Sequence, residues 1–320
     1  MRWSSGSVRR APELALAALL AVAAGSAAAD LAFVTCQNGN ALSVLDLETG
    51  AETARWSVPG KPAGVAVGPD GTVYTVVPDA RTVRRHGPGG KVLAEAVLDG
   101  GPMGAALDAD RSRLYVSDWY NARLWVLEAE TLKVITELPA GAAPAGLALS
   151  PDGALLAAAE RDADRVSLYD AETMTLARRV PVGTRPFGLG FAPDGRLFVG
   201  NVGSNDVTVI DPTSGARLAT LAVGDRPYGV AFAAGRAFVS NQYAGTVSVI
   251  ALDTLEPLAE LAVGDYPEGI AATSDGRIAV ANWFDNTLSL IDARSLEVVA
   301  ELDTADGPRA FGAFILATGD

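Results

Sequence analysis

The sequence predicts an all-β fold, a seven-bladed β-propeller whose blades are antiparallel four-stranded sheets. Three observations predict it: a proline motif recurs at nearly constant spacing, each repeat contains four short strand patterns, and two incomplete repeats at the chain ends complete each other. Successive prolines lie 40, 42, 42, 41, 40 and 41 residues apart. They are Pro62, Pro102, Pro144, Pro186, Pro227, Pro267 and Pro308.

The residue two positions after each proline is small. It is glycine in the first six repeats, and in the last the motif reads Pro308-Arg309-Ala310. A fixed period of this length marks a repeat architecture in which each repeat is one structural unit. What all repeats share therefore belongs to the scaffold, and a residue that only some repeats carry is a candidate for function.

The best-preserved repeat indicates how one blade is built. Four segments of strand composition are separated by turns such as Pro193-Asp194-Gly195, where glycine permits a left-handed backbone. Apolar and polar residues alternate in the third segment, as in a strand that packs between neighbours. We name the expected strands A to D in chain order, and in this repeat they are residues 185–191, 197–201, 207–210 and 217–223.

The two chain ends are incomplete repeats. Six whole repeats run from about residue 59 to residue 304. The segment 31–58 contains strands B, C and D, whereas the segment 308–315 contains a strand A alone. We therefore predict that N-terminal strands B–D and the C-terminal strand A form the seventh blade and close the ring. Closure removes two free sheet edges that an open array would expose.

Residues 1–29 have the pattern of a secretory signal peptide. Three arginines precede an apolar segment at 14–24, and three alanines at 27–29 form a small-residue cleavage site. The apolar segment, 11 residues long, is too short to span a membrane. We expect residues 30–320 to be one propeller domain, periplasmic or secreted, without membrane insertion.

The composition disfavours several kinds of site. A net charge of −13 is unsuited to nucleic acid, which attracts basic surfaces. The single histidine, His86, and single cysteine, Cys36, cannot supply the usual ligand sets of zinc, copper or haem. We therefore assign no catalytic residue, no metal and no cofactor. We expect Cys36 to be a small buried strand residue and His86 to lie on a solvated strand without a role.

Two repeats carry a more specific pattern, in which strand B ends in asparagine and strand C reads as alternating Val, Thr, Ser and Ile. They are residues 198–201 with 207–211, and residues 238–241 with 246–250. This pattern resembles the YVTN-type β-propeller repeat, and the resemblance covers nearly all of residues 30–320. Similar propellers include heavy subunits of exported quinone-cofactor amine dehydrogenases and proteins associated with pyrroloquinoline-quinone-dependent oxidation. The resemblance thus implies an accessory role in a periplasmic quinoprotein or cytochrome oxidation system, without the redox centre itself.

The candidate site lies at the mouth of the central channel. In a four-stranded blade the D–A and B–C loops lie on the same face, and the later repeats carry aromatic and charged residues in these loops. Such a patch is typical of recognition surfaces, and its arginines favour a small anionic ligand or an acidic partner segment. The predicted binding residues are Trp119, Tyr120, Arg185, Phe187, Arg226, Tyr228, Tyr243, Tyr266, Glu268, Trp283, Phe284 and Arg309.

Structural interpretations of the same residues stay open. The three arginines also suit ion pairs with Asp225, Asp265 and Glu268 that tie blades together, and the aromatic rings also suit a plug in the channel. The asparagines that end strand B suit turn caps. With Asp118 and Glu160 they also suit an oxygen-only cation site. These asparagines are Asn201, Asn241 and Asn282.

The sequence leaves two classes of function. The first is a monomeric, non-catalytic exported propeller that binds a partner protein or a small anionic ligand at its mouth. The alternative is an enzyme or enzyme subunit, either a heavy subunit like those of amine dehydrogenases or a metal-assisted lactonase. Acid–base chemistry in such an enzyme needs a perturbed carboxylate, and the carboxylates near the mouth are Asp118, Glu160 and Glu268.

Overall fold

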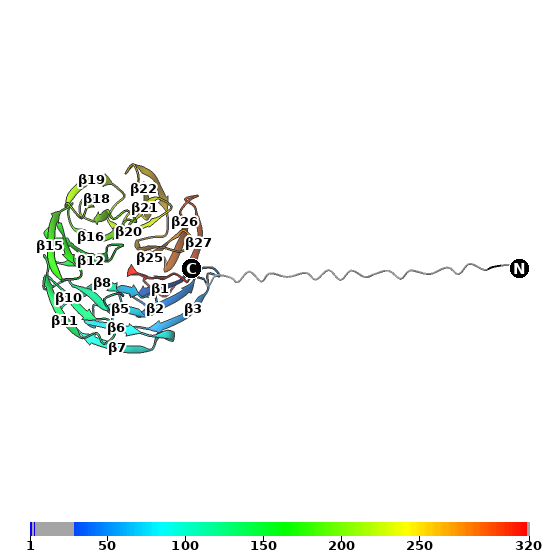
Figure 1. The fold of residues 1–320 in the computed structure, drawn as a ribbon, viewed down its shortest axis with the longest axis horizontal. Coiled ribbons are helices and arrows are strands. Elements are labelled where there is room, and N and C mark those ends of the chain that lie inside the picture. The colour runs from blue at the N-terminus through cyan, green and yellow to red at the C-terminus, as the bar shows by residue number, and fades with distance from the viewer. Residues whose placement is uncertain (2, 4–28, 319–320) are drawn as a thin grey trace.

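The computed structural model describes residues 1, 3 and 29–318. Most of the expected signal peptide, residues 1–29, lies outside the described residues. The described chain forms seven β-sheets arranged as the blades of a ring (Figure 1), so the predicted seven-bladed, all-β fold is confirmed. Within the described residues, no helix is long and apolar enough to cross a membrane.

Six blades are continuous in sequence, and their strands follow one another from the ring centre outward. The first three, from the innermost strand, are β4 (Gly64–Val67), β5 (Val73–Val77), β6 (Thr82–His86) and β7 (Val92–Val97); β8 (Pro102–Asp108), β9 (Arg113–Asp118), β10 (Arg123–Glu128) and β11 (Val134–Pro139); and β12 (Pro144–Leu149), β13 (Leu155–Glu160), β14 (Arg165–Asp170) and β15 (Thr175–Pro181). The next three are β16 (Pro186–Phe191), β17 (Leu197–Asn201), β18 (Asp206–Asp211) and β19 (Ala216–Ala222); β20 (Pro227–Ala233), β21 (Arg236–Asn241), β22 (Thr246–Ala251) and β23 (Pro257–Ala262); and β24 (Pro267–Ala272), β25 (Arg277–Asn282), β26 (Thr287–Asp292) and β27 (Val298–Asp303). Two short 3₁₀ turns are η1 (Pro88–Gly90) and η2 (Arg161–Ala163).

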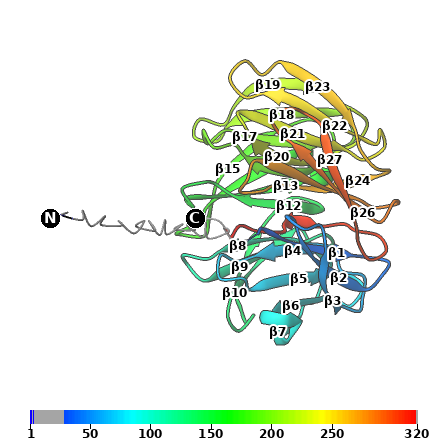
Figure 2. The ribbon, with the colours of Figure 1, turned by 90° about the vertical axis from the view of Figure 1, so that its right-hand side faces the viewer.

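The seventh blade joins the two ends of the chain. It contains β1 (Leu31–Cys36), β2 (Ala41–Asp46) and β3 (Glu52–Ser57), and β29 (Ile315–Leu316) pairs antiparallel with β1. In Figures 1 and 2 the red C-terminal segment lies beside blue β1 near the middle of the ring. The predicted closure, with N-terminal strands B–D and C-terminal strand A, is therefore confirmed.

Strand A of this closing blade is divided in a way that the repeat does not predict. Between its contacts with β1, the chain pairs in parallel with β4 of the next blade through β28 (Phe311–Ala313). Gly312 makes this detour feasible, because it has φ +131° and its Cβ position lies 2.2 Å from the Val65 carbonyl oxygen. Any other residue would be strained and would clash there.

The glycine of the Pro-x-Gly motif sets the spacing of the innermost strands. A Cβ on Gly188 would lie 1.9 Å from the carbonyl oxygen of Tyr228 in the next blade. The hydroxyl of Ser240 then links two blades, accepting from the Gly229 N–H at 3.0 Å and donating to the Glu268 carbonyl at 2.7 Å. Close backbone approach around the channel therefore fixes where the residue after each proline stands.

The core consists of apolar layers between neighbouring blades, and it corrects one expectation. Cys36 is buried, as predicted. His86 is buried too, so the expectation of a solvated strand is wrong. Its Nε2 lies 2.9 Å from Thr75 Oγ1, and its ring stacks on Trp56 of β3 at 5.6 Å. Burial lowers the pKa of His86, which favours the neutral ring in this layer.

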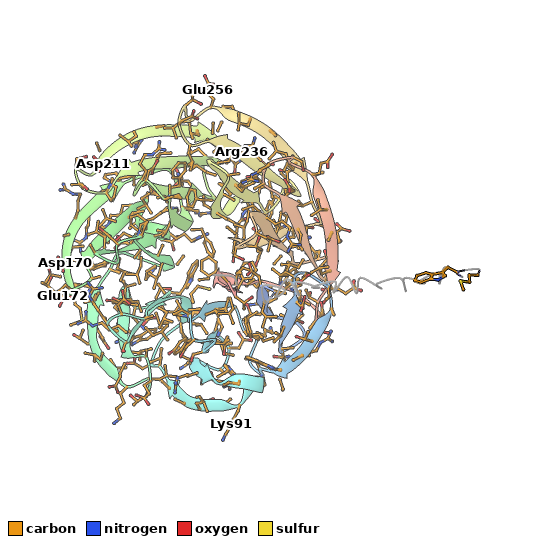
Figure 3. The ribbon with its side chains drawn as sticks, turned by 45° about the vertical axis from the view of Figure 1, so that its right-hand side comes forward. Lys91, Asp170, Glu172, Asp211, Arg236 and Glu256 are labelled. Atoms are coloured by element: carbon orange, nitrogen blue, oxygen red, sulfur yellow. The ribbon has the colours of Figure 1, made fainter. Side chains whose placement is uncertain are left out.

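The outside of the ring exposes charged side chains together with apolar ones of the outermost strands, such as Val97 and Val299. Lys91, Glu172 and Glu256 are exposed and lie at its periphery (Figure 3). Side chains that distinguish one blade from another lie near the channel, on the face that carries the D–A and B–C loops.

Candidate functional site

A cavity of about 310 Å³ lies at the predicted mouth of the channel. Most of its lining comes from two positions of each repeat: the residue after the repeated proline, which starts strand A, and the residue directly after strand B. The lining residues are Gln37, Trp119, Arg161, Phe187, Val202, Arg226, Tyr228, Gln242, Tyr266, Glu268, Trp283 and Arg309. We call this the mouth cavity.

Eight of the twelve predicted binding residues line the mouth cavity, and four do not. Tyr120, Tyr243 and Phe284 occupy the second position after strand B and are 76%, 57% and 56% exposed. The first residue after strand B lines the cavity in several blades, whereas the second is exposed on the rim, where Tyr243 and Phe284 still pack on the lining residue Tyr266. Arg185 precedes a proline on the rim and is also exposed. These four residues therefore do not line the mouth cavity.

Four lining residues were not predicted. Gln37, Arg161, Val202 and Gln242 all follow strand B directly, as Trp119 and Trp283 do. Selecting the largest aromatic residues in these loops missed them, whereas aligning the repeats on the end of strand B would have found all four. The signal was the position in the repeat and not the residue type.

The rings of Phe187 and Tyr228 form the floor of the mouth cavity, and together with Phe311 they make one aromatic layer. Phe187 packs on Tyr228 and on Phe311, with ring centroids 4.6 Å and 5.0 Å apart, and Tyr228 and Phe311 are 5.5 Å apart. On the other side of this layer is a second cavity of about 670 Å³, lined by the innermost strands. We call it the inner funnel. The aromatic plug, which the sequence analysis gave as an alternative role for these rings, is therefore present, and it divides the channel into two compartments.

Glu268 is the buried carboxylate of the mouth cavity and is 2% exposed. Gln242 Nε2 donates to its Oε1 at 2.6 Å, and Arg309 Nε lies 3.1 Å from its Oε2. Arg309 also donates to the Tyr228 hydroxyl, from Nε at 3.0 Å and Nη2 at 2.9 Å. Burial raises the pKa of Glu268, and the positive charge of Arg309 offsets only part of that rise.

The guanidinium of Arg226 packs against a row of aromatic rings, which we call the aromatic wall: Tyr243, Tyr266 and Trp283. The backbone of Arg226 is left-handed, with φ +57°. Its guanidinium carbon lies 4.4 Å from the centroid of the Tyr243 ring, and Nη1 donates to the Tyr243 hydroxyl at 2.8 Å. Tyr266 continues the wall between Tyr243 and Trp283, with centroids 5.4 Å and 5.8 Å away. Burial and the Tyr243 hydroxyl raise the pKa of Tyr266 to about 12.

The three arginines differ in whether they form the ion pairs that the sequence analysis gave as an alternative to ligand binding. Arg309 forms the expected ion pair with Glu268. Arg226 and Arg185 form no ion pair with any residue in the described part of the chain. The guanidinium of Arg226 therefore brings to the cavity a positive charge that has no ion pair among the described residues, although it also acts on Glu268, where it limits the rise in the pKa.

Three buried polar atoms around the mouth cavity have no hydrogen-bond partner among the described residues. They are Nε of Arg226, Nε1 of Trp283 and Oε2 of Glu268. Oε2 of Glu268 is near Arg309 Nε, but that N–H is directed at the Tyr228 hydroxyl, so the contact is a charge pair without hydrogen-bond alignment. Buried polar groups are normally satisfied, and leaving one unpaired costs about 1–3 kcal/mol. All three atoms belong to residues that line the mouth cavity.

The oxygen-only cation site is not formed. Asp118 and Glu160 each pair with an arginine of their own blade, Arg123 and Arg165, so guanidinium groups occupy their oxygens. Burial raises the pKa of Asp118, but the Gly101 N–H, Asn121 and Arg123 outweigh it, and the net shift is downward. No group of three or more His, Cys, Asp or Glu residues suited to a metal occurs in the part of the chain that the structure describes.

The asparagines that end strand B also stay within their blades. Asn241 Nδ2 donates to Thr246 Oγ1 at 3.0 Å and to Ser248 Oγ at 2.8 Å, both on strand β22. Asn282 and Asn201 bond to the following strand in the same way. They hold strands B and C together and do not line the mouth cavity.

Comparison with known proteins identifies the fold. No protein-family model matches the chain, and no curated protein sequence matches it. Among solved structures it is similar to a functionally unknown protein from Desulfotomaculum acetoxidans DSM 771 (TM-score 0.76, 17% identity, covering 91% of this chain and 99% of that one). It is also similar to Kuenenia stuttgartiensis hydrazine synthase, with a TM-score of 0.70 and 20% identity, covering 79% of this chain and 89% of that one. A streptogramin B lyase is similar too, with a TM-score of 0.68 and 19% identity, covering 79% of this chain and 90% of that one. At these identities the likeness shows the fold alone: the chain is a seven-bladed β-propeller.

Proposed function

We propose that this protein is an exported, non-catalytic propeller that binds a small anionic ligand in the mouth cavity. The observation that carries the proposal is the set of three unpartnered polar atoms, on Arg226, Trp283 and Glu268, around one cavity of about 310 Å³. A bound molecule would satisfy all three at once. Because these atoms are recessed, a small ligand reaches them more readily than the surface of a partner protein does.

The charge of the site favours an anion. Arg226 lacks a carboxylate partner among the described residues, and the indole N–H of Trp283 is a donor only. Together they form a cationic and donating corner in a protein of net charge −13. Arginine pairs well with carboxylates and phosphates because its N–H groups match their planar oxygens.

Export and family remain parts of this proposal that rest on the sequence. The pattern of residues 1–29 supports a periplasmic or secreted protein. The two repeats in which strand B ends at Asn201 and at Asn241 support membership of the YVTN-type propellers. On that basis the ligand-binding propeller serves as an accessory to a periplasmic quinoprotein or cytochrome oxidation system.

The proposal is tested by titrating the purified protein with benzoate and with succinate. Trp119 and Trp283 line the cavity, so tryptophan fluorescence reports occupancy. We expect a Kd of about 1 mM or tighter for at least one acid. The double variant R226Q/W283F removes the positive charge at 226 and the indole donor at 283 and keeps a ring at 283, and it should weaken binding by about tenfold or more in a protein that stays folded.

The matched control is R185Q. Arg185 precedes a proline in the neighbouring blade and has the same left-handed backbone, with φ +53°, but it lies outside the cavity. The affinity of R185Q for benzoate and for succinate should equal that of the wild type. Binding of neither acid, or equal affinities for R226Q/W283F and R185Q, would reject the mouth cavity as an anion site.

An enzyme is the second candidate, and one observation favours it. Glu268 is a buried carboxylate with a raised pKa that faces the cavity, as an acid–base catalyst requires. Under this reading the purified protein would hydrolyse a simple lactone such as γ-butyrolactone, and E268Q would abolish that activity. No hydrolysis by the wild type, together with reversible carboxylate binding, would favour the non-catalytic function.

A further inference from the structure

We infer that the mouth cavity takes a small aromatic hydroxy acid, with the carboxylate at Arg226 and Trp283, the ring against the aromatic floor and the hydroxyl on Glu268. This inference rests on the proposed anion-binding function and deepens it. It follows from the number, kind and surroundings of the unpartnered atoms.

The carboxylate end is set by the two free donors. Nε of Arg226 and Nε1 of Trp283 both need an acceptor, and a carboxylate offers one oxygen to each. The rest of the Arg226 guanidinium is already fixed, since Nη1 donates to Tyr243 and the plane lies over that ring. The charge is therefore held in place before the ligand arrives, which reduces the entropy lost on binding.

The second polar contact must come from a donor group on the ligand, because the remaining atom without a hydrogen-bond partner is Oε2 of Glu268. A neutral hydroxyl suits it better than an ammonium group. Arg161, Arg226 and Arg309 all line the cavity, whereas Glu268 is the one carboxylate among the lining residues and is already paired with Arg309. Arg161 is paired with Asp162, so an ammonium ligand would add a second unpaired positive charge beside that of Arg226.

The body of the ligand must be flat and apolar. Five of the twelve lining residues are aromatic, and the floor is the packed layer of Phe187 and Tyr228. An aromatic ring gains from stacked or edge contacts with such walls beyond its buried area. A volume of about 310 Å³ is at the small end of the ~300–1,000 Å³ usual for ligand pockets, which favours a ligand with a single ring.

Calorimetric titration of the full exported protein with a matched set of compounds tests this inference. The hydroxy acids are 4-hydroxybenzoate and the longer 4-hydroxyphenylacetate, and benzoate and phenylacetate are their partners without a hydroxyl. 4-Aminomethylbenzoate replaces the hydroxyl with an ammonium group, 4-hydroxybenzyl alcohol lacks the carboxylate, and trans-4-hydroxycyclohexanecarboxylate lacks the flat ring.

At least one hydroxy acid should bind about tenfold or more tightly than its partner without the hydroxyl, and more tightly than the three other analogues. E268Q should remove this preference for the hydroxyl. R226Q should weaken the binding of a hydroxy acid and of the matching acid without a hydroxyl by the same factor. The wild-type comparison decides the inference even if E268Q does not fold.

Three results overturn the inference and leave the proposed function standing. They are equal affinities for hydroxy acids and their partners, a preference for 4-aminomethylbenzoate, and equal binding of the cyclohexane acid. Failure of every carboxylate to bind overturns the inference and the proposed function together. A preference for hydroxy acids that E268Q retains in a folded protein also overturns the inference, because Glu268 then does not read the hydroxyl.

Discussion

The two compartments of the channel differ although the same repeats line both. The inner funnel is lined by the innermost strands, from the Pro-x-Gly glycines to the A–B turns, with side chains such as Leu147, Phe191 and Ile270. The mouth cavity is lined by loop residues that vary between blades, including three arginines and a buried glutamate. The aromatic layer of Phe187, Tyr228 and Phe311 separates them.

The difference shows where the repeat leaves freedom to vary. Innermost strands approach so closely that a Cβ at Gly188 would meet a neighbouring carbonyl oxygen, so backbone spacing dictates the residues there. The residue after strand B has no such constraint, and it is Gln37 in one blade and Trp283 in another. Recognition chemistry therefore collects at the loop end of a channel whose strand end belongs to the scaffold.

The largest effect is expected from removing the segment that contributes to both compartments. Deleting residues 311–320 removes β28, β29 and Phe311, and with them the fully buried Phe314. Losing one buried phenylalanine alone costs about 3–5 kcal/mol, and the deletion also leaves β1 with an open edge. The melting temperature measured by circular dichroism should fall sharply. An unchanged melting temperature would contradict closure of the ring by the C-terminal segment.

A smaller effect should come from one methyl group in the inner funnel. G188A places a Cβ 1.9 Å from the Tyr228 carbonyl oxygen and should cost about 3 kcal/mol by urea denaturation. The control is G195A at an A–B turn, where φ is +86° and no heavy atom lies within 4 Å of the new Cβ. It should cost about 1 kcal/mol, from the left-handed backbone alone. Equal costs would show that blade spacing is not set by these glycines.

The smallest effect concerns two buried carboxylates near the mouth, Glu268 and Asp118. The folded-state pKa of Glu268 is raised above its ordinary value of 4.5, chiefly by burial. That of Asp118 is lowered below 3.8, because hydrogen bonds and Arg123 outweigh burial. Glu268 therefore adds stability that is complete below pH 4.5 and is lost as the pH rises through its folded pKa. Asp118 adds stability that is complete above pH 3.8 and is lost as the pH falls through its folded pKa.

Unfolding free energies of the wild type, E268Q and D118N across the acid range check these signs. The stability of the wild type relative to E268Q should decrease as the pH rises above 4.5. Relative to D118N it should decrease as the pH falls below 3.8. Parallel pH profiles for the two variants would mean that the two carboxylates do not differ in their environments.

Much of the fold was predictable because the repeat encodes it locally. The spacing of Pro62 to Pro308 gave the number of blades, and the missing strand A before Leu31 gave the closure. The detour of β28 was not predictable, because it depends on how Gly312 meets the Val65 carbonyl of another blade. Burial of His86 likewise depends on Trp56, which is 30 residues away in a neighbouring blade.

The candidate site was predictable in composition and less so in detail. The face was identified from the loops, and eight of its residues were named. Tyr120 and Phe284 are exposed and do not line the cavity, and residue type alone does not say which side of a turn a ring faces. The free atoms of Arg226, Trp283 and Glu268 were beyond the sequence, since they result from side-chain orientations set by several blades at once.

The most direct test of the central claim is a crystal structure of the protein soaked with benzoate. We predict the carboxylate within hydrogen-bond distance of Arg226 Nε and Trp283 Nε1, with the ring above Phe187 and Tyr228 in the mouth cavity. Benzoate found in the inner funnel, or a mouth cavity that stays free of it at saturating concentration, would contradict the claim that recognition lies at the loop end of the channel.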